Sequence, residues 1–125
     1  MNRIVLSGNL CRDIELKKTK NEKIYSENVI AVRKDRKDID GNYSSDFINF
    51  VCFEGISNYL KNYSKKGDKI ELEGQLRVDS WKDSEGNNHN KTYVVVDKLN
   101  ILTSRNINEK TKENSFEITD EDLPF

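Results

Sequence analysis

Two phenylalanines stand on a strand face where polar residues would be expected. In the segment DFINFVCF at 46–53, Phe47 and Phe53 share one face, with Asn49 between them. Phe50 belongs to the opposite face, because side chains alternate at period two along a strand. Both faces thus carry large apolar groups, whereas a half-buried strand has one polar face. Either the strand is buried on both sides, or the Phe47/Phe53 face is an apolar surface kept for a partner.

The lone tryptophan is a second sign of a binding surface. In the segment 69–81, apolar residues alternate with polar ones, and Trp81 falls on the polar face together with Arg77. An indole on a polar face is typical of a contact with a partner. The alternative is a rim tryptophan that covers the end of a closed sheet.

The charges are divided unevenly along the chain. The formal net charge is −1, but residues 1–104 contain 18 Lys or Arg against 16 Asp or Glu, and residues 105–125 contain three against six. A near-neutral total therefore does not exclude a polyanionic ligand for the body of the protein. Four of the cations fall within 33–37, where the alternative is an ordinary solvated loop.

No catalytic or metal-binding group is expected. Cys11 and Cys52 are too few and too far apart for a zinc site or a disulfide framework, and Cys52 alternates with core residues. His89, the only histidine, lies in a polar hairpin without nearby ligand residues, which favours a solvated position. The chain also lacks a Gly-rich phosphate cradle and a Ser/His/Asp set, so we expect neither an enzyme nor a cofactor.

A metal-dependent nuclease is the catalytic alternative. A metal-dependent nuclease needs clustered carboxylates, and the charged loop 33–45 contains three: Asp35, Asp38 and Asp40. They stand among lysines and arginines, which argues against a divalent cation at this place.

The elements that position these residues read as a small all-β domain. Strands are expected at 3–10, 24–32, 46–53, 69–81 and, in two pieces, at 92–96 and 98–102; a helix is expected at 56–64. Gly74 permits a sharp bend in the long strand, and turns are expected at 40–41 and 83–87. Five strongly curved strands, with one short helix between the third and the fourth, describe a closed sheet better than a sandwich.

The chain divides into three parts. Residues 1–104 form the folded domain, 105–115 a flexible linker without periodicity, and 116–125 an acidic tip, so that the tail after the domain is expected to be disordered. Hydrophobic and charged residues each make up 34% of the sequence, which agrees with a part that never joins the core. Without a signal peptide or a long apolar run, a soluble cytoplasmic protein is expected, with no membrane contact.

Several motifs in order resemble the bacterial and phage single-stranded-DNA-binding protein (SSB) family. They are NRIVLSGNL at 2–10, DIEL at 13–16, SDFINFVCF at 45–53, YLKNYSKKGDKIELEGQLR at 59–77, WKDSEGN at 81–87 and DEDLPF at 120–125. The resemblance covers nearly the whole chain. It implies a nucleoid-associated protein with a five-stranded OB-fold barrel, usually a homotetramer, that coats unpaired DNA without sequence preference.

The resemblance also implies roles for individual residues. Its base-stacking positions fall on Phe47, Phe53 and Trp81, and a fourth falls on Arg36, which is not aromatic but can stack through its guanidinium plane. For the two phenylalanines, contact with another protomer is the alternative. The candidate phosphate contacts are Arg3, Arg33, Lys34, Arg36, Arg77 and Lys82.

The tip is implied to recruit enzymes of replication, recombination and repair. Its docking residues would be Asp120, Glu121, Asp122, Leu123, Pro124 and Phe125. Acids attract a basic pocket, while the apolar end and the terminal carboxylate suit a slot rimmed by cations. The alternatives are a mere solubilising tail, an OB-fold that binds RNA, and a protein that acts mainly as an interaction hub.

Overall fold

The computed structural model describes residues 1–103. Its elements are β1 (Ile4–Leu10), β2 (Lys17–Lys18), β3 (Ile24–Arg33), β4 (Ser45–Phe53), α1 (Glu54–Tyr63), β5 (Lys69–Lys82) and β6 (Asn88–Ile101). The expected linker at 105–115 and tip at 116–125 lie outside the described residues. Five long strands and one helix between the third and the fourth of them confirm the predicted fold class.

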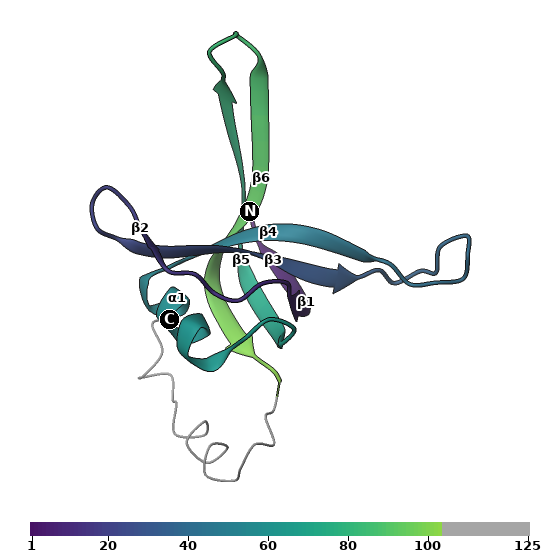
Figure 1. The fold of residues 1–125 in the computed structure, drawn as a ribbon. Coiled ribbons are helices and arrows are strands. Elements are labelled where there is room, and N and C mark those ends of the chain that lie inside the picture. The colour runs from purple at the N-terminus through teal and green to yellow at the C-terminus, as the bar shows by residue number, and fades with distance from the viewer. Residues whose placement is uncertain (104–125) are drawn as a thin grey trace.

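The long strands close into a ring. Their order is β1-β5-β6-β4-β3, with the two-residue β2 beyond β3, and β1 pairs with β3 as well as with β5. All pairings are antiparallel except that between β4 and β6, which run parallel at Phe50–Val94 and Val51–Val95. Figure 1 shows β3 and β4 crossing over β1 and the lower part of β5 and β6. Every long strand of the ring therefore has one inner and one outer face.

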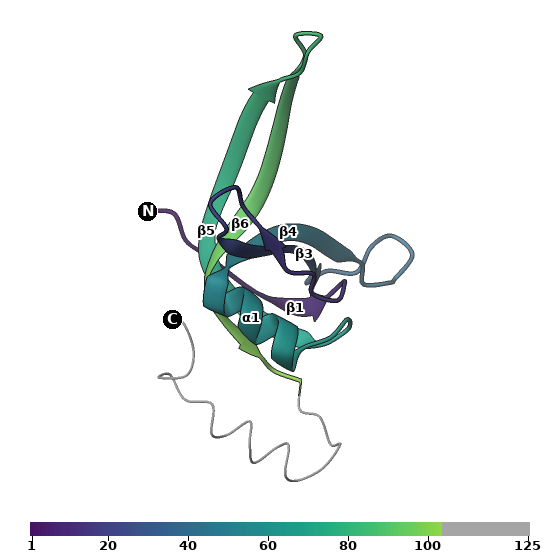
Figure 2. The same ribbon diagram turned by 60° about the vertical axis from the view of Figure 1, so that its left-hand side comes forward.

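The core fills the inside of the ring. Its fully buried members include Phe50, Ile70 and Leu72 from the strands and Leu60 from α1. The helix lies across one end of the ring (Figure 2). Cys52 is also fully buried, as its alternation with core residues predicts, and burial raises the pKa of its thiol above the ordinary value.

Gly74 is where β5 bends against β6. The register shifts between Glu73 and Gly74, so that Asp97 is an extra residue in β6. A Cβ atom on Gly74 would lie 2.0 Å from the carbonyl oxygen of Val95. Only glycine fits this close approach, which lies at a bulge whose extra residue belongs to β6.

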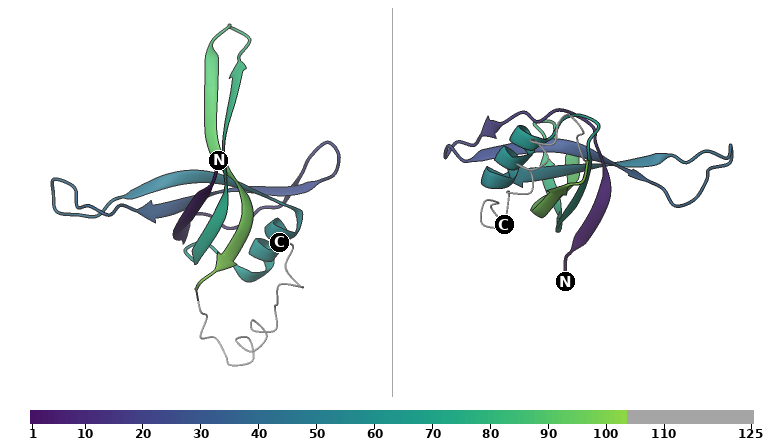
Figure 3. Two further views of the ribbon diagram at one scale, coloured as in Figure 1. Left: turned by 180° about the vertical axis from the view of Figure 1, so that it is seen from behind. Right: turned by 90° about the horizontal axis from the view of Figure 1, so that it is seen from below.

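Hairpins project from the ring in different directions. The outer halves of β5 and β6 form an arm, at the top of Figure 1 and in the view from behind in Figure 3. The loop between β3 and β4 forms another projection, and the hairpin of β2 and β3 extends on the opposite side. Leu76 and Val78 alternate with polar residues as core positions do, yet they are 38% and 58% exposed. They lie on the arm, beyond the helix and the strands that cover the core.

Most local details agree with the sequence. The exceptions are the start of the helix and the last strand, which runs unbroken over Asn88–Ile101 instead of in the two pieces expected at 92–96 and 98–102. The turns at Gly41 and Gly86 have positive φ angles of 82° and 84°, as the turn motifs predict. The helix begins at Glu54 rather than Ile56, directly after β4 and without a loop, because Glu54 adopts a φ of 49° that turns the chain at once. Within residues 1–103 no helix is long and apolar enough to cross a membrane.

Candidate nucleic-acid interface

Strand register places the three candidate rings on one outer face. Residues paired across strands share a face, and the decisive pairs are Ala31–Phe47, Tyr25–Phe53, Val51–Val95, Arg77–Tyr93 and Trp81–His89. The residues of these pairs on β4, on β6 and on the arm therefore all lie on the same side of the sheet. We call this outer surface of β3, β4, β6 and the arm the ring face, after the aromatic rings that it carries.

The three rings on the ring face are accessible. Phe47 is 70% exposed, Phe53 36% and Trp81 49%, whereas the inward-facing Phe50 is 1% exposed. Of the two interpretations of segment 46–53, a strand buried on both sides is therefore wrong within one chain. For Phe47 and Phe53, the remaining alternative is contact with a second protomer.

Phe53 lies in a group of residues that sequence reasoning missed. The Tyr25 ring is 6.4 Å from the Phe53 ring, centroid to centroid, and the ammonium of Lys23 is 5.6 Å from the same ring. Lys17 pairs with Tyr25 and so joins this face. In the sequence the segment 17–23 is a polar run without apolar alternation, so it is the pairing of β2 with β3 that identifies the position of its lysines.

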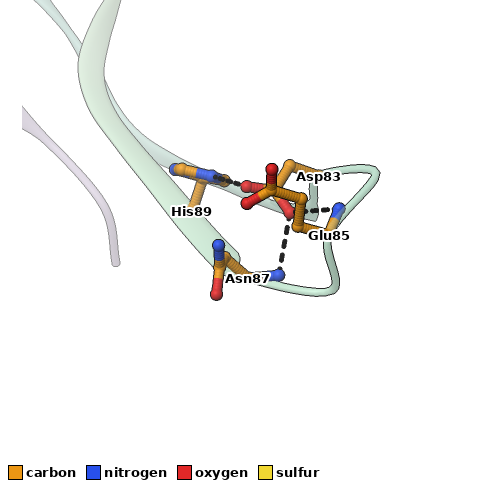
Figure 4. Close-up of polar contacts among 4 residues, drawn as sticks. All are labelled: Asp83, Glu85, Asn87 and His89. Carbon is orange, nitrogen blue, oxygen red and sulfur yellow. Dashed lines mark hydrogen bonds and ion pairs between the residues drawn. The ribbon is translucent and has the colours of Figure 1, made fainter.

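His89 is exposed, as its place in a polar hairpin predicts, but its ring stacks on Trp81, a contact that the sequence did not indicate. The two ring centroids are 5.6 Å apart and the planes are inclined by 22°. The Nε2 atom of His89 lies 2.8 Å from a carboxylate oxygen of Asp83 (Figure 4). The other oxygen of Asp83 accepts hydrogen bonds from the backbone N–H groups of Glu85 and Asn87. The His89 bond is the main reason that the pKa of Asp83 is lowered, with these backbone donors contributing.

Further contacts hold the arm to the ring. At its base, the side-chain amide of Asn2 donates to the carbonyl of Leu76 at 2.8 Å and accepts from the N–H of Leu76 at 2.9 Å. Higher up, Lys91 lies 3.8 Å from Glu27 of β3. Within the arm itself, Tyr93 of β6 donates to Asp79 of β5 at 2.8 Å, and this bond raises the pKa of the phenol. The arm is thus braced against the surface that carries Phe47 and Phe53.

The predicted cations are brought together only in part. Arg77, which pairs with Tyr93, and Arg33, which pairs with Ser45, lie on the ring face. Lys34 forms an ion pair of 3.6 Å with Asp46, which neighbours Phe47 and so belongs to the opposite face of β4. Lys82 follows Trp81 and likewise falls on the other face of the arm.

Two more predicted cations stand apart from the rings. The guanidinium of Arg3, which precedes β1, forms an ion pair of 2.5 Å with Glu73 of β5. Arg36 is exposed in the loop between β3 and β4. A phosphate at Arg3 would therefore have to displace a carboxylate, whereas one at Arg36 would not have to displace any contact found among the described residues.

Of the three carboxylates that the nuclease alternative needs, Asp38 has a structural use. Asp38 accepts the backbone N–H groups of Asp40, at 3.0 Å, and of Asn42, at 2.9 Å, and so shapes the loop. Across the described part of the chain, no three His, Cys, Asp or Glu residues are grouped to hold a metal ion. The loop thus provides no metal centre within residues 1–103.

A comparison with known families decides the classification. The family model of the Single-strand binding protein family matches residues 1–102. The chain belongs to this family. The match covers every strand and the helix, and the closed ring with one helix is the OB-fold expected of the family.

Curated relatives align over the whole chain. Single-stranded DNA-binding protein 2 of Staphylococcus aureus (strain COL) is 33% identical, and the alignment covers 100% of this chain and 99% of the relative. Single-stranded DNA-binding protein 3 of Streptococcus agalactiae serotype V is 29% identical with the same coverage. Single-stranded DNA-binding protein 1 of Streptococcus pyogenes serotype M18 is 30% identical, again with 100% and 99% covered.

Proposed function

We propose that this protein binds single-stranded DNA without sequence preference, through the ring face, and has no catalytic activity. The observation that carries the proposal is that Phe47, Phe53 and Trp81 are exposed and in register on one surface. Every base has a π-face, so stacking on such rings is tolerant of sequence. The names of the family and of its relatives support the same ligand.

Two physical contributions share the work of binding. Alanine substitution in single-strand-binding proteins assigns about 1–3 kcal/mol to each base stacked on an aromatic ring. The backbone phosphates need cations nearby, and we assign this role to the residues named from the sequence together with three that the structure adds. They are Arg3, Arg33, Lys34, Arg36, Arg77 and Lys82, and in addition Lys17, Lys23 and Lys91.

These cations differ in how close they lie to the aromatic rings of the ring face. Lys23 lies next to Phe53, Arg77 and Lys91 lie on the arm with Trp81, and Arg33 ends β3 opposite Ser45, on the face that carries Phe47. A strand that stacks its bases on these rings must place its phosphates nearby. If about five phosphates are neutralised, the slope of log affinity against log salt should be roughly −3.5, at −0.7 per phosphate for single strands. Lys34 and Lys82 lie on the side of the sheet away from the ring face, so they should contribute less to the affinity.

A fluorescence titration tests the proposal, because Trp81 is the only tryptophan. Poly-dT added at several salt concentrations should quench the fluorescence to a plateau at a defined number of nucleotides per protomer, with affinity falling as salt rises. Absence of binding at low salt would refute the proposal and leave the ring face as a protein contact. Preference for structured RNA over poly-dT at equal salt would favour the RNA-binding alternative.

We further propose that the segment 120–125 recruits enzymes of DNA replication, recombination and repair, and that the protein acts as a homotetramer in the cytoplasm at the nucleoid. Three acids followed by Leu-Pro-Phe combine charge attraction with an apolar anchor, and Pro124 lowers the entropy lost on docking. Deleting these six residues should abolish capture of replication and repair enzymes while preserving the quenching titration. Retention of capture would refute the role of the tip, and light scattering would determine the assembly.

A further inference from the structure

Tyr43 stands at the stem of the projecting loop between β3 and β4. Its side chain is 43% exposed. The guanidinium carbon of Arg33 lies 4.1 Å from the centroid of the Tyr43 ring, and the ammonium of Lys37 lies 5.8 Å from it. An exposed aromatic ring thus has two cations in contact with it, at a place that the motifs of the sequence did not single out.

The register of β3 and β4 places this ring at the end of the ring face. Arg33 pairs with Ser45, and Ala31 pairs with Phe47, so Arg33 belongs to the same face as Phe47. The N–H of Lys34 donates to the carbonyl of Ser44 at 2.9 Å, which continues the pairing one residue beyond β4. Because Arg33 packs on the Tyr43 ring from this face, Tyr43 extends the row formed by Phe53 and Phe47.

The loop that carries Tyr43 is internally braced. The N–H of Asp38 donates to the carbonyl of Asn42 at 2.8 Å, and that of Gly41 to the carbonyl of Asp38 at 3.0 Å. The Asp38 carboxylate accepts two further backbone N–H groups of the loop. Gly41 supplies the positive φ of 82° that the turn requires. A ring held at the foot of such a turn loses little freedom when a ligand binds.

We propose that Tyr43 is an additional base-stacking platform, with Arg33 and Lys37 as the partners of the neighbouring phosphates. The inference rests on the proposed function. Tyr43 stands four residues from Phe47, which corresponds to about 13 Å along an extended strand. The path of single-stranded DNA then runs along β4 from Phe53 past Phe47 and out onto the projecting loop.

A tryptophan reporter at position 43 tests the platform directly. In the double variant Trp81→Phe/Tyr43→Trp, the only indole sits at position 43. Added poly-dT should quench it, with a plateau at the same nucleotide ratio at which the anisotropy of labelled oligo-dT saturates. The matched control is Trp81→Phe/Tyr63→Trp, because Tyr63 is 48% exposed on α1, which lies across one end of the ring. Its fluorescence should stay unquenched.

The outcomes separate this inference from the proposed function. Binding by anisotropy without quenching at position 43, or with equal quenching at both positions, would overturn the Tyr43 platform and leave the proposed function standing. No binding by either variant at low salt would overturn both.

Substitutions of Tyr43 itself give a second reading. Tyr43→Ala should raise the dissociation constant for long oligo-dT by about 5- to 150-fold, the range for one stacked base. Tyr43→Phe keeps an aromatic ring and should bind oligo-dT like the wild type. If Tyr43→Ala lowers the stability in urea but leaves the affinity for oligo-dT unchanged, Tyr43 stabilises the loop and does not stack on a base, and the inference is overturned.

Discussion

The rings of Trp81 and His89 are stacked, with centroids 5.6 Å apart, and Asp83 anchors the histidine from the tip of the same hairpin at 2.8 Å. The stack matters because the arm projects beyond the core, so that packing in the core does not order the indole. A tryptophan that already packs on a fixed neighbour loses less rotamer freedom when a base stacks on it. His89 is therefore interpreted as a positioning residue for Trp81.

Replacement of His89 should weaken binding through Trp81. An aromatic pair contributes about 0.5–1.5 kcal/mol beyond its buried area, so His89→Ala should raise the dissociation constant for oligo-dT by about 2- to 10-fold at constant salt. His89→Phe keeps a ring beside the indole and should retain most of the affinity. Equal affinities for wild type and His89→Ala, measured by anisotropy, would show that the stack does not position Trp81.

The pKa of Asp83 should depend on His89. Because the hydrogen bonds of the hairpin favour the carboxylate, the folded pKa lies below the unfolded one. Their contribution to stability is thus complete above the unfolded pKa and is lost as the pH falls through the folded one. In His89→Phe the pKa should rise toward its ordinary value, while the backbone donors still hold part of the shift.

Carboxyl carbon NMR over a pH series measures this shift. Asn90→Ala is the matched control, since the side chain of Asn90 accepts from Ser80 and is no partner of Asp83, and it should leave the pKa near that of the wild type. An unchanged pKa in His89→Phe would contradict the assignment of His89 as the main cause.

Gly74 should be irreplaceable for packing. A Cβ atom there meets the backbone of β6 rather than a movable side chain, so Gly74→Ala should lower the free energy of unfolding by about 1–3 kcal/mol. Gln75→Ala, on the outer side of β5, should change it by less than about 0.5 kcal/mol. Urea denaturation at one protein concentration compares the two, and equal stabilities would mean that the strands can separate at this point without cost.

The salt dependence of binding should show whether Lys23, next to Phe53, contacts a phosphate. Lys23→Ala removes one proposed phosphate contact, which should make the slope of log affinity against log salt shallower by about 0.7. Lys61, whose ammonium donates to the carbonyl of Ile14 at 3.1 Å on the helix side, provides the control, and Lys61→Ala should leave the slope unchanged. The same slope in both variants would exclude Lys23 from the path of the DNA.

Local signals in the sequence were sufficient for most of the fold. Alternation located the long strands, apolar spacing located the helix, and Gly41, Gly74 and Gly86 marked two turns and a bend, because each of these signals acts within a few neighbouring residues. Leu76 and Val78 show the limit of such signals. Alternation reports which side chains share a face, but not whether another layer covers that face.

The candidate site was predictable only where one strand carries it. Phe47 and Phe53 share a strand, so period two was enough to put them on one face. Lys23 and Tyr43 join that face through pairing between strands, and His89 joins Trp81 through the register of the arm. Such pairings are set by the closure of the whole ring, which no short window of sequence encodes.

The most direct measurement compares oligo-dT binding by Phe47→Ala, Phe53→Ala and Trp81→Ala with that by Tyr63→Ala, by anisotropy at several salt concentrations. Light scattering of each variant establishes that the assembly is unchanged. Each ring on the ring face should contribute about 1–3 kcal/mol, a roughly 5- to 150-fold loss of affinity, with an unaltered salt slope, whereas Tyr63→Ala should bind like the wild type. Affinities of the three variants equal to that of Tyr63→Ala would contradict stacking of DNA on this surface.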